Sequence, residues 1–515
     1  MLRFEVYNNG VPAKDIDLSG AYLFGQDMIP IRADLAAANG QVTCIKRVPG
    51  ACGLALLWDA GSAGRFMLAT TRLPERNKSY NLNLELARAQ MMRIAQKRED
   101  WGLFDYADAE HLNREYDAVR KKFIAALQAV DSAQAAVLAD QALADGVTLG
   151  EKVALFHADI FLTRRKASGA TVTRTSFGCV VDLFSTTEPY QERLRETFDF
   201  VNIPLPWKHT EPKERICKYT QIDTWINWAV RHRKPILAGP LLCFEPSHLP
   251  EWLYIWENDY EALRDMIYDH VQRIVNRYKR QVAIWNVVSG IHANNSFNLN
   301  FEQLMELTRM TCLLVKKLAP QAQVMIELVL PWGEYYARNQ RTIPPLMYAD
   351  MAAQSGIKFD AFGLKMLMGV PFDGMYVRDL MQISSLLDEF VSFSKAVHVT
   401  ACQVPSDVTP DAWDAWGGQA PVPKAGFWHA LWSQRLQAEW VQAFYRIAIS
   451  KPFIESISWL DLADYEGHYL PHGGLCRNDM EPKLAYRELR NFKASLAADA
   501  PTVQTVATRI VKSEG

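Results

Sequence analysis

Short hydrophobic runs separated by turn residues characterise the first 75 positions of the chain. The five clearest runs are Phe4–Tyr7, Ala21–Phe24, Gln41–Ile45, Leu54–Trp58 and Phe66–Thr71, with Gly, Pro, Asp and Asn between them. Runs of this length with such punctuation are typical of β-strands. We therefore expect residues 1–75 to form a small β-sandwich-like module, which serves either to bind sugar or to pack against other parts of the assembly.

The hydrophobic period changes after these predicted strands. Leu82 and Leu86 begin a series at helical spacing, and Ala118–Leu143 is a long run rich in alanine and other strong helix formers. Gly146 interrupts the region. The pattern predicts a helical connector over residues 76–168, with its apolar stripe buried as core.

From about residue 169 the pattern alternates between short apolar runs and helical segments. The expected strands are Ser176–Val181, Phe198–Ile203, Pro235–Gly239, Val282–Val287, Gln323–Leu328, Asp360–Leu364, Ala396–Thr400 and Ser456–Leu460. The expected helices between them include Tyr260–Tyr278, Phe301–Leu318, Met375–Phe393 and Leu431–Ile449. Eight β/α repeats favour a closed parallel barrel over an open sheet, and we find no glycine-rich phosphate-binding fingerprint that would support the open sheet. The predicted fold class is α/β, with a (β/α)8 TIM barrel over residues 169–495 and a C-terminal tail over 496–515.

Composition and charge narrow the function classes. Hydrophobic residues make up 49% of the 515 positions and aromatic residues 11%, so the chain has enough apolar side chains for a large core. The formal net charge is −2, without a long basic or acidic block, which argues against nucleic acid as a partner. No run approaches the roughly 18 apolar residues of a transmembrane helix, and the start of the chain does not resemble a signal peptide. We therefore expect a cytoplasmic protein without a membrane partner, with eight reduced cysteines and no cofactor.

Two of the predicted strands carry motifs similar to those of a known family. Trp285-Asn-Val-Val-Ser-Gly290 resembles the Trp-Asp-Val-Val-Asn-Glu strand of glycoside hydrolase family 10, the xylanase family, and Val399-Thr-Ala401 resembles its Ile-Thr-Glu strand. Further similar motifs, which follow the family's order along the chain, are Trp207-Lys-His-Thr-Glu-Pro212, Leu249-Pro-Glu-Trp252, Arg277-Tyr-Lys279 and Pro482-Lys-Leu-Ala-Tyr486. The resemblance covers roughly residues 175–489 and implies the same barrel fold.

The resemblance also identifies two positions at which this chain departs from the family. In the family, the first glutamate is the general acid/base and the second is the nucleophile of a retaining glycosidase. Gly290 stands at the acid/base position and Ala401 at the nucleophile position. Ser289, Lys365 and Leu367 replace side chains that hold the sugar in the family. Because proton transfer and covalent attack each require a specific group, we expect xylanase-type catalysis to be absent.

The carboxyl ends of the strands form the working face of such a barrel, and ionisable and aromatic residues are predicted there. The candidate ligand-binding residues are Glu327, Trp332, Lys365, Asp461, His292 and Trp459. Carboxylate and ammonium groups can hold sugar hydroxyls, and an indole ring can cover an apolar sugar face. Glu327 and Lys365 follow neighbouring strands, so they can equally neutralise each other as an ion pair.

The loops after the last two strands hold further candidates. The tryptophans of the loop after the seventh strand either stack on a sugar or bury against the rim of the barrel; they are Trp413, Trp416, Trp428 and Trp432. His468 and His472 with Asp464 carry atoms that can bind a metal, but their spacing matches no recognised motif. The sequence therefore predicts no metal site.

Three functions remain open at this point. The first is a family 10-like pseudoenzyme of carbohydrate metabolism that binds a carbohydrate or a partner without cleaving it. The second is an active glycoside hydrolase with relocated acids, such as Glu327 with Asp461 or Asp464. The third is a structural subunit, in a possible homo-oligomer, whose residues 1–166 form contacts between protomers.

Overall fold

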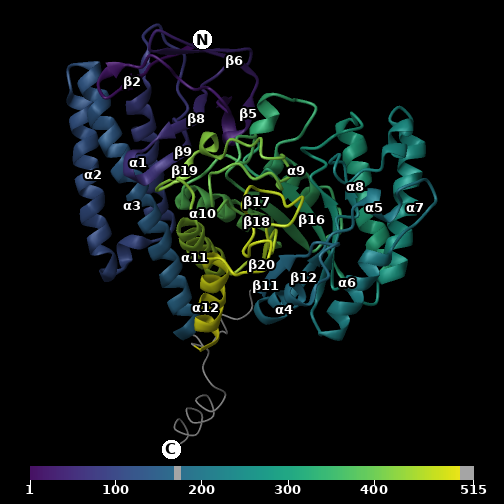
Figure 1. Cartoon of the computed structure of the whole chain (residues 1–515). Coiled ribbons are helices and arrows are strands. Elements are labelled where there is room, and N and C mark those ends of the chain that lie inside the picture. The colour runs from purple at the N-terminus through teal and green to yellow at the C-terminus, as the bar shows by residue number, and fades with distance from the viewer. Residues whose placement is uncertain (168–175, 499–515) are drawn as a thin grey trace, which may run out of the picture.

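Eight parallel strands close into a barrel in the computed structural model, which describes residues 1–167 and 176–498 (Figure 1). The barrel strands are β11 (Ser176–Val180), β12 (Phe200–Ile203), β13 (Ile236–Ala238), β15 (Ile284–Ser289), β16 (Gln323–Val329), β17 (Ala361–Leu367), β18 (Ala396–Gln403) and β20 (Ile454–Trp459). Each pairs with its neighbours, and β11 pairs with both β12 and β20, which completes the ring. The predicted TIM barrel is confirmed, and each of the eight predicted strands is present.

Helices surround the barrel between successive strands. They are α4 (Glu188–Thr197), α5 (Trp207–Thr210), α6 (Thr220–Arg231), α7 (Tyr260–Tyr278), α8 (Phe301–Leu318), α9 (Pro345–Gln354), α10 (Leu380–Glu389), α11 (Gln434–Ser450) and α12 (Leu484–Ala498). The predictions for α7 and α8 match at both ends, because Asp259 and Asn300 cap the first turns through side-chain bonds to the backbone. The predicted start at Met375 is wrong, since Asp379 caps α10 and its first helical residue is Leu380.

The interior of the barrel changes character along its axis. Near the amino ends of the strands, Phe200, Leu237, Met325 and Ala361 form an apolar cluster. Towards the carboxyl ends the buried side chains become polar. At the last residue of β15, for example, Ser289 Oγ donates a hydrogen bond to Glu327 of β16. The apolar layer closes the amino end of the barrel and leaves the chemistry to the opposite end.

Two further sheets, built mainly from residues before the barrel, are antiparallel except for the parallel β1–β10 pair. One has the strand order β10-β1-β7-β6 and the other β19-β9-β8-β4-β5. Their strands are β1 (Leu2–Glu5), β4 (Tyr22–Phe24), β5 (Pro30–Ile31), β6 (Ala33–Ala38), β7 (Gln41–Lys46), β8 (Gly53–Asp59), β9 (Gly64–Ala69), β10 (Tyr80–Asn81) and β19 (Phe427–Trp428), beside a small β2–β3 pair at Tyr7–Asn8 and Val11–Pro12. The alanine-rich β6 was not predicted. It forms because Asn39 and Gly40, both with positive φ, turn the chain back onto β7.

Three helices connect these sheets to the barrel: α1 (Leu82–Asp100), α2 (Glu110–Gln128) and α3 (Ser132–Ala167). The predicted run Ala118–Leu143 is therefore two helices, since α2 ends at Gln128 and α3 begins at Ser132. Gly146 lies inside α3, where the absence of a side chain lets Gln90 of α1 approach and donate to its carbonyl at 3.0 Å. That residues 1–75 and 76–168 are separate domains stays a prediction, and residues 499–515 of the predicted tail lie outside the described residues.

Glu151 of α3 joins the connector to the barrel. Its carboxylate accepts from Trp428 Nε1 at 2.7 Å and from the Leu380 backbone at 3.2 Å, and it lies 3.1 Å from His429 Nε2. Trp428 belongs to β19, which comes from the barrel region and extends the N-terminal sheet along β9. One carboxylate therefore links α3, α10 and β19, which are far apart in the sequence.

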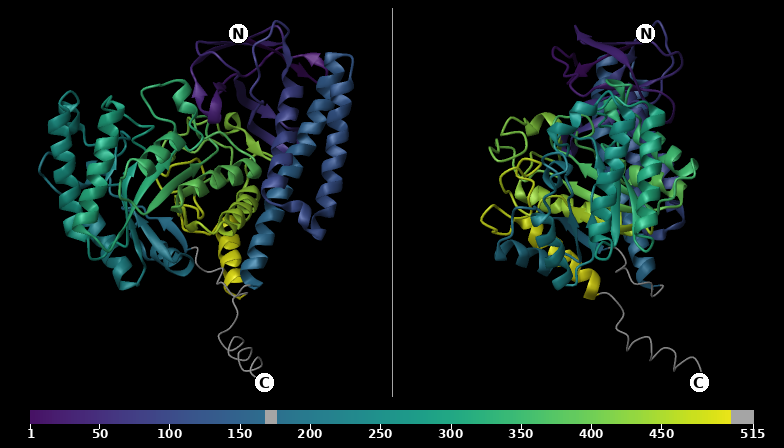
Figure 2. Two further views of the ribbon diagram at one scale, coloured as in Figure 1. Left: turned by 180° about the vertical axis from the view of Figure 1, so that it is seen from behind. Right: turned by 90° about the vertical axis from the view of Figure 1, so that its right-hand side faces the viewer.

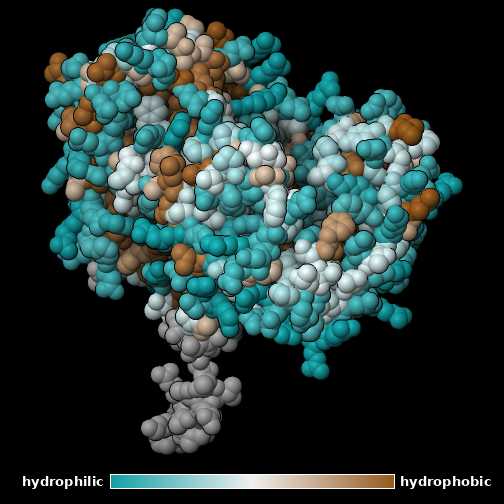
Figure 3. All heavy atoms as spheres, in the orientation of Figure 1, coloured by the Kyte–Doolittle hydropathy of each residue, from teal (hydrophilic) through white to brown (hydrophobic). Residues whose placement is uncertain are grey.

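The outer surface mixes hydrophilic and hydrophobic residues. Figure 2 shows α1–α3 on one side of the molecule and α7 and α8 on the other. On the face drawn in Figure 3, hydrophobic residues are dispersed, with more of them over the N-terminal strands. Among the described residues, no helix combines the length and apolarity needed to span a bilayer.

The contact between Glu151 and His429 predicts a pH-dependent stability. The hydrogen bond with Glu151 raises the pKa of His429 against the opposing effect of burial. Stability from a raised histidine pKa is complete below the unfolded value of about 6.5 and is lost as pH rises through the folded value. We expect His429→Asn, which tolerates the positive φ of this position, to lower the melting temperature more at pH 6 than at pH 8.5.

Differential scanning calorimetry at both pH values measures this effect. Glu151→Gln is the matched variant, because it keeps the acceptor for Trp428 but removes the charge that favours protonated His429. An equal loss of melting temperature at both pH values in His429→Asn would contradict the prediction.

Candidate functional site

Strand register gathers several of the predicted site residues at the carboxyl end of the barrel. Ser289 of β15 pairs with Glu327 of β16, and Lys365 of β17 pairs with Val329 on one side and Ala401 on the other. Ser289 Oγ donates a hydrogen bond to Glu327 Oε2. The mouth therefore contains a carboxylate and an ammonium group on adjacent strands.

Glu245, in the loop after the short strand β14 (Leu242–Cys243), is the chief electrostatic partner of Lys365. Although burial opposes its charge, the pKa of Lys365 is raised, because Glu245 first, then Tyr469 and Glu327, favour the protonated form. Burial likewise opposes the charge of Glu245, yet Lys365 holds the pKa of that carboxyl below its usual value. The Lys365 ammonium also lies 4.8 Å from the centre of the Tyr469 ring. Lys365 therefore interacts electrostatically with Glu245 as well as with Glu327, the partner predicted from the sequence.

Gly290 occupies a tight turn at the end of β15. Its φ is +62°, and its carbonyl accepts from Asn294 at 2.8 Å. A Cβ atom at this position would lie 2.7 Å from Val329 Cγ2, closer than real Cβ atoms approach other groups. A larger residue here needs both a strained backbone and movement of Val329.

Ala401 lies in an apolar part of the mouth. It is 3% exposed and belongs to a cluster with Leu367, Val370, Met375 and Leu470. Both Ala401 and Gly290 are at the carboxyl end of the barrel, with β16 and β17 between their strands on one side. The two positions that the family resemblance identifies therefore differ in their surroundings. Gly290 lies in a crowded turn, and Ala401 lies in an apolar cluster.

Aromatic side chains border this region. Phe372 stacks on Trp416 with ring centroids 4.2 Å apart, and Trp416 lies edge-on to Tyr469 at 6.1 Å. Phe372 is 44% exposed and Trp413 47%. Sequence reasoning named Trp413 and Trp416 but missed Tyr469 and Phe372, whose proximity depends on how their loops fold.

Three of the predicted binding residues have internal partners. His292 is fully buried, its Nδ1 lies 2.7 Å from Tyr335 Oη, and burial lowers the pKa of His292 to about 3. Trp459 is also fully buried and donates to the Gly473 carbonyl at 3.1 Å. Trp332 is half-buried, with the Arg378 guanidinium 4.7 Å from its ring centre. Their role in ligand binding stays a prediction.

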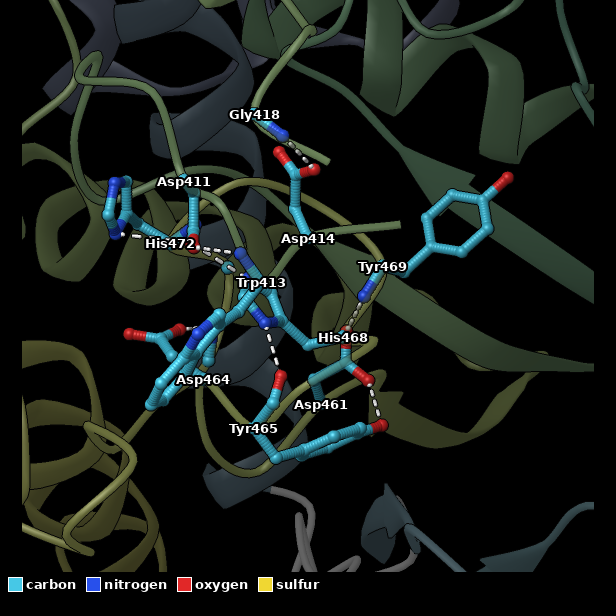
Figure 4. Close-up of polar contacts among 12 residues, drawn as sticks. Asp411, Trp413, Asp414, Gly418, Asp461, Asp464, Tyr465, His468, Tyr469 and His472 are labelled. Atoms are coloured by element: carbon cyan, nitrogen blue, oxygen red, sulfur yellow. Dashed lines mark hydrogen bonds and ion pairs between the residues drawn. The ribbon is translucent and has the colours of Figure 1, made fainter. Parts of the chain in front are cut away.

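Asp461 organises the loop after β20 (Figure 4). One carboxylate oxygen accepts from Tyr465 Oη at 2.6 Å, and the other accepts from Gln403 Nε2 and the Tyr469 backbone, both at 2.9 Å. Burial raises the pKa of Asp461, and these hydrogen bonds counteract it. The carboxylate therefore fixes Tyr469, which faces Lys365, in place.

The three side chains considered as metal ligands from the sequence have other partners in the structure: His468 and His472 contact Asp411, and Asp464 contacts Lys483. Asp411 Oδ2 lies 2.9 Å from His468 Nε2 and 3.3 Å from His472 Nδ1 (Figure 4). Asp464 instead forms a 2.6 Å ion pair with Lys483. The two histidines thus share a carboxylate that is not Asp464, and the cluster holds the loop together.

We expect Asp461→Ala to destabilise the protein by about 1 to 3 kcal/mol, because it leaves buried donors without their acceptor. Tyr469 should lose its fixed position, so limited proteolysis within the loop after β20 should become faster. Denaturant unfolding and proteolysis provide the two measurements.

Glu466→Ala is the control, since this exposed residue lies on the same loop. If the two variants unfold at the same denaturant concentration, Asp461 does not anchor the loop.

Comparisons with known proteins agree with the barrel and its motifs. The profile of glycosyl hydrolase family 10 matches residues 167–466. An endo-1,4-beta-xylanase/feruloyl esterase of Xylanibacter ruminicola is 20% identical over 344 residues, 62% of this chain and 46% of the relative. An endo-1,4-beta-xylanase of Agaricus bisporus is 31% identical over 105 residues, 20% of this chain and 31% of the relative. The chain thus spans less than half the length of these curated relatives.

Solved structures resemble the barrel at low sequence identity. Native xylanase 10B from Thermotoga maritima is 14% identical, with a TM-score of 0.47 over 64% of this chain and 98% of that one. Xylanase 10B from Thermotoga petrophila in complex with xylobiose is 15% identical, with a TM-score of 0.45 over 62% and 94%. Because the family profile matches more than half of the residues of this chain, the chain belongs to glycosyl hydrolase family 10.

Proposed function

We propose that this family 10 protein binds a carbohydrate at the barrel mouth and does not cleave it by the family's two-carboxylate mechanism. The proposal is carried by Gly290 and Ala401, which the resemblance to the family's motifs aligns with the positions of the acid/base and the nucleophile. A retaining glycosidase needs a carboxyl group at both positions. Neither glycine nor alanine can transfer a proton or attack a sugar.

The surroundings of both positions support the proposal. At Gly290, the positive φ and the contact with Val329 leave no room for a glutamate without rearrangement. At Ala401, the apolar cluster would surround an introduced carboxylate with Leu367 and Met375, which disfavours its charged form. Both environments fit the small side chains that are present.

The rest of the mouth supports carbohydrate as the ligand class. Lys365, Glu245 and Glu327 provide charged hydrogen-bonding groups, and Tyr469 and Trp416 lie beside them. A small number of polar groups bordered by aromatic rings is suitable for binding a sugar. The polar groups can hydrogen bond with its hydroxyls, and the rings can cover its apolar face. We also propose Trp332 and Asp461 at the edge of this site, Asp461 acting through Tyr469.

One observation favours a second candidate, a hydrolase with relocated acids. Glu245 and Glu327 both act on Lys365, so two carboxylates lie near the mouth. Asp461 is less suited to the role, because both of its oxygens already accept hydrogen bonds. A hydrolase of this kind would lose its activity in Glu245→Gln or Glu327→Gln.

We expect no measurable cleavage of xylan or of an activated aryl xyloside by the parent protein. Loss of one essential group typically costs several powers of ten in rate, and losses within one catalytic unit are not additive. Gly290→Glu and Ala401→Glu, separately and together, should also remain inactive, because neither environment accepts an ionised glutamate in place. Product release by each protein is measured under one set of conditions.

Robust cleavage by the parent would contradict the proposal and favour the relocated acids. In that case Glu245→Gln and Glu327→Gln identify them. Melting temperatures of all variants show that a missing rate is not a missing fold.

We expect the parent protein to bind at least one ligand of a glycan panel. The variants Lys365→Met and Trp416→Ala should each bind that ligand about tenfold more weakly, which is a loss of about 1.4 kcal/mol in binding free energy. Lys365→Met removes the central charge at similar volume, and Trp416→Ala removes a stacking ring. Phe104→Ala is the control, because Phe104 is 59% exposed but lies beside α1, far from the barrel mouth. Equal affinity for the parent and both site variants would place the ligand elsewhere.

A further inference from the structure

The loop that follows β14 brings together three side chains of metal-binding types. Cys243, Glu245 and His248 each direct one potential ligand atom towards the others, and these atoms all lie within 4.8 Å of one another. Within residues 1–167 and 176–498, no other group of three such side chains is as close. The three residues fall within six positions of the sequence, in a spacing that the sequence analysis did not single out.

The backbone of this loop is held in place from several sides. Cys243 pairs with Ser289 of β15, and Ser296 Oγ donates to the Phe244 carbonyl at 2.6 Å. The backbone N–H of His248 donates to the Glu245 carbonyl at 2.8 Å, and the His248 carbonyl accepts from the backbone N–H of Lys208 at 2.9 Å. The convergence of the three side chains is therefore supported by the barrel itself and does not depend on a free loop.

Ser247 orients the imidazole of His248. Its hydroxyl lies 3.0 Å from His248 Nδ1. When the hydroxyl oxygen accepts from Nδ1–H, the lone pair of Nε2 is free for a metal, as in sites where a neighbouring group fixes the other ring nitrogen.

A zinc-class metal binds the thiolate of cysteine and the neutral imidazole of histidine, so the Cys243 thiol releases its proton when the metal binds.

The surrounding charges set limits on the affinity. Lys365 and Lys208 face the group from β17 and α5, and both oppose a dication. Glu327 adds negative charge near Cys243 and Lys365. A metal that gains much of its binding energy from a thiolate bond overcomes this balance, whereas a hard ion held by charge alone does not.

We propose that Cys243, Glu245 and His248 bind a divalent transition-metal ion of the zinc class. One sulfur, one nitrogen and one oxygen ligand match the preference of zinc, and small side-chain rotations bring atoms within 4.8 Å to tetrahedral separations. Three protein ligands leave one position for water or a ligand oxygen. The site borders Lys365 but does not rest on the proposed carbohydrate function.

The test uses the full chain without an affinity tag, stripped of metals with a chelator. Zinc is titrated against a competing chromophoric chelator, and cobalt is added separately to follow the thiolate-to-cobalt charge-transfer band. We expect one zinc per chain and a cobalt charge-transfer band. Cys243→Ser should abolish the band, His248→Gln should abolish stoichiometric zinc binding, and Ser247→Ala should weaken it about tenfold.

Cys312→Ser is the matched control, because Cys312 is a buried thiol on α8 outside the group. Unchanged zinc binding and an unchanged cobalt band in this variant support the assignment. The proposal is overturned if the parent binds no stoichiometric zinc, or if the cobalt band persists in Cys243→Ser. Melting temperatures confirm that each variant is folded.

Discussion

Closure of the eight-stranded barrel is the constraint on which the rest of the structure depends. The hydrogen bonds between neighbouring strands place Ser289 beside Glu327, and Lys365 between Val329 and Ala401. A shift of one residue in any strand would turn these side chains from the interior to the helical shell. The mouth is therefore a consequence of register, and its chemistry depends on which residues occupy the last positions of each strand.

This mouth has a charged side and an apolar side. Partial burial of an ammonium is costly unless carboxylates lie near it, and Glu245 and Glu327 lie near the half-buried Lys365. On the other side, Ala401 packs with Leu367 and Leu470. The same fold that supports a two-carboxylate mechanism in other proteins here supports a cation with its counter-ions beside an apolar cluster.

The connection between the N-terminal sheets and the barrel likewise depends on a charged side chain with several polar partners. β19 leaves the barrel region to pair with β9, and Trp428 donates its indole N–H to Glu151 of α3. A buried carboxylate needs several donors, and here they come from two separate segments of the chain, Trp428 with His429 and the backbone of Leu380. The sheets, the helical connector and the barrel consequently share one hydrophobic core.

Local sequence determined the elements and the resemblance to the family's motifs. The period of α8 and its Asn300 cap are contained in neighbouring residues, as are the apolar runs of the eight strands, so both were predictable. The motifs around Gly290 and Ala401 also lie in short stretches of sequence, so the proposal about these two residues could be made before the structure was known.

Tertiary structure alone decided which side chains meet. It brought Glu245 near Lys365, placed His468 beside Asp411 and not beside Asp464, and extended the N-terminal sheet with β19. Each of these partners lies far away in the sequence, or in a loop whose path no local pattern encodes. Propensity and hydrophobic period report on residues within a few positions of each other, whereas the pairing of charges depends on distances that exist only after the barrel has closed.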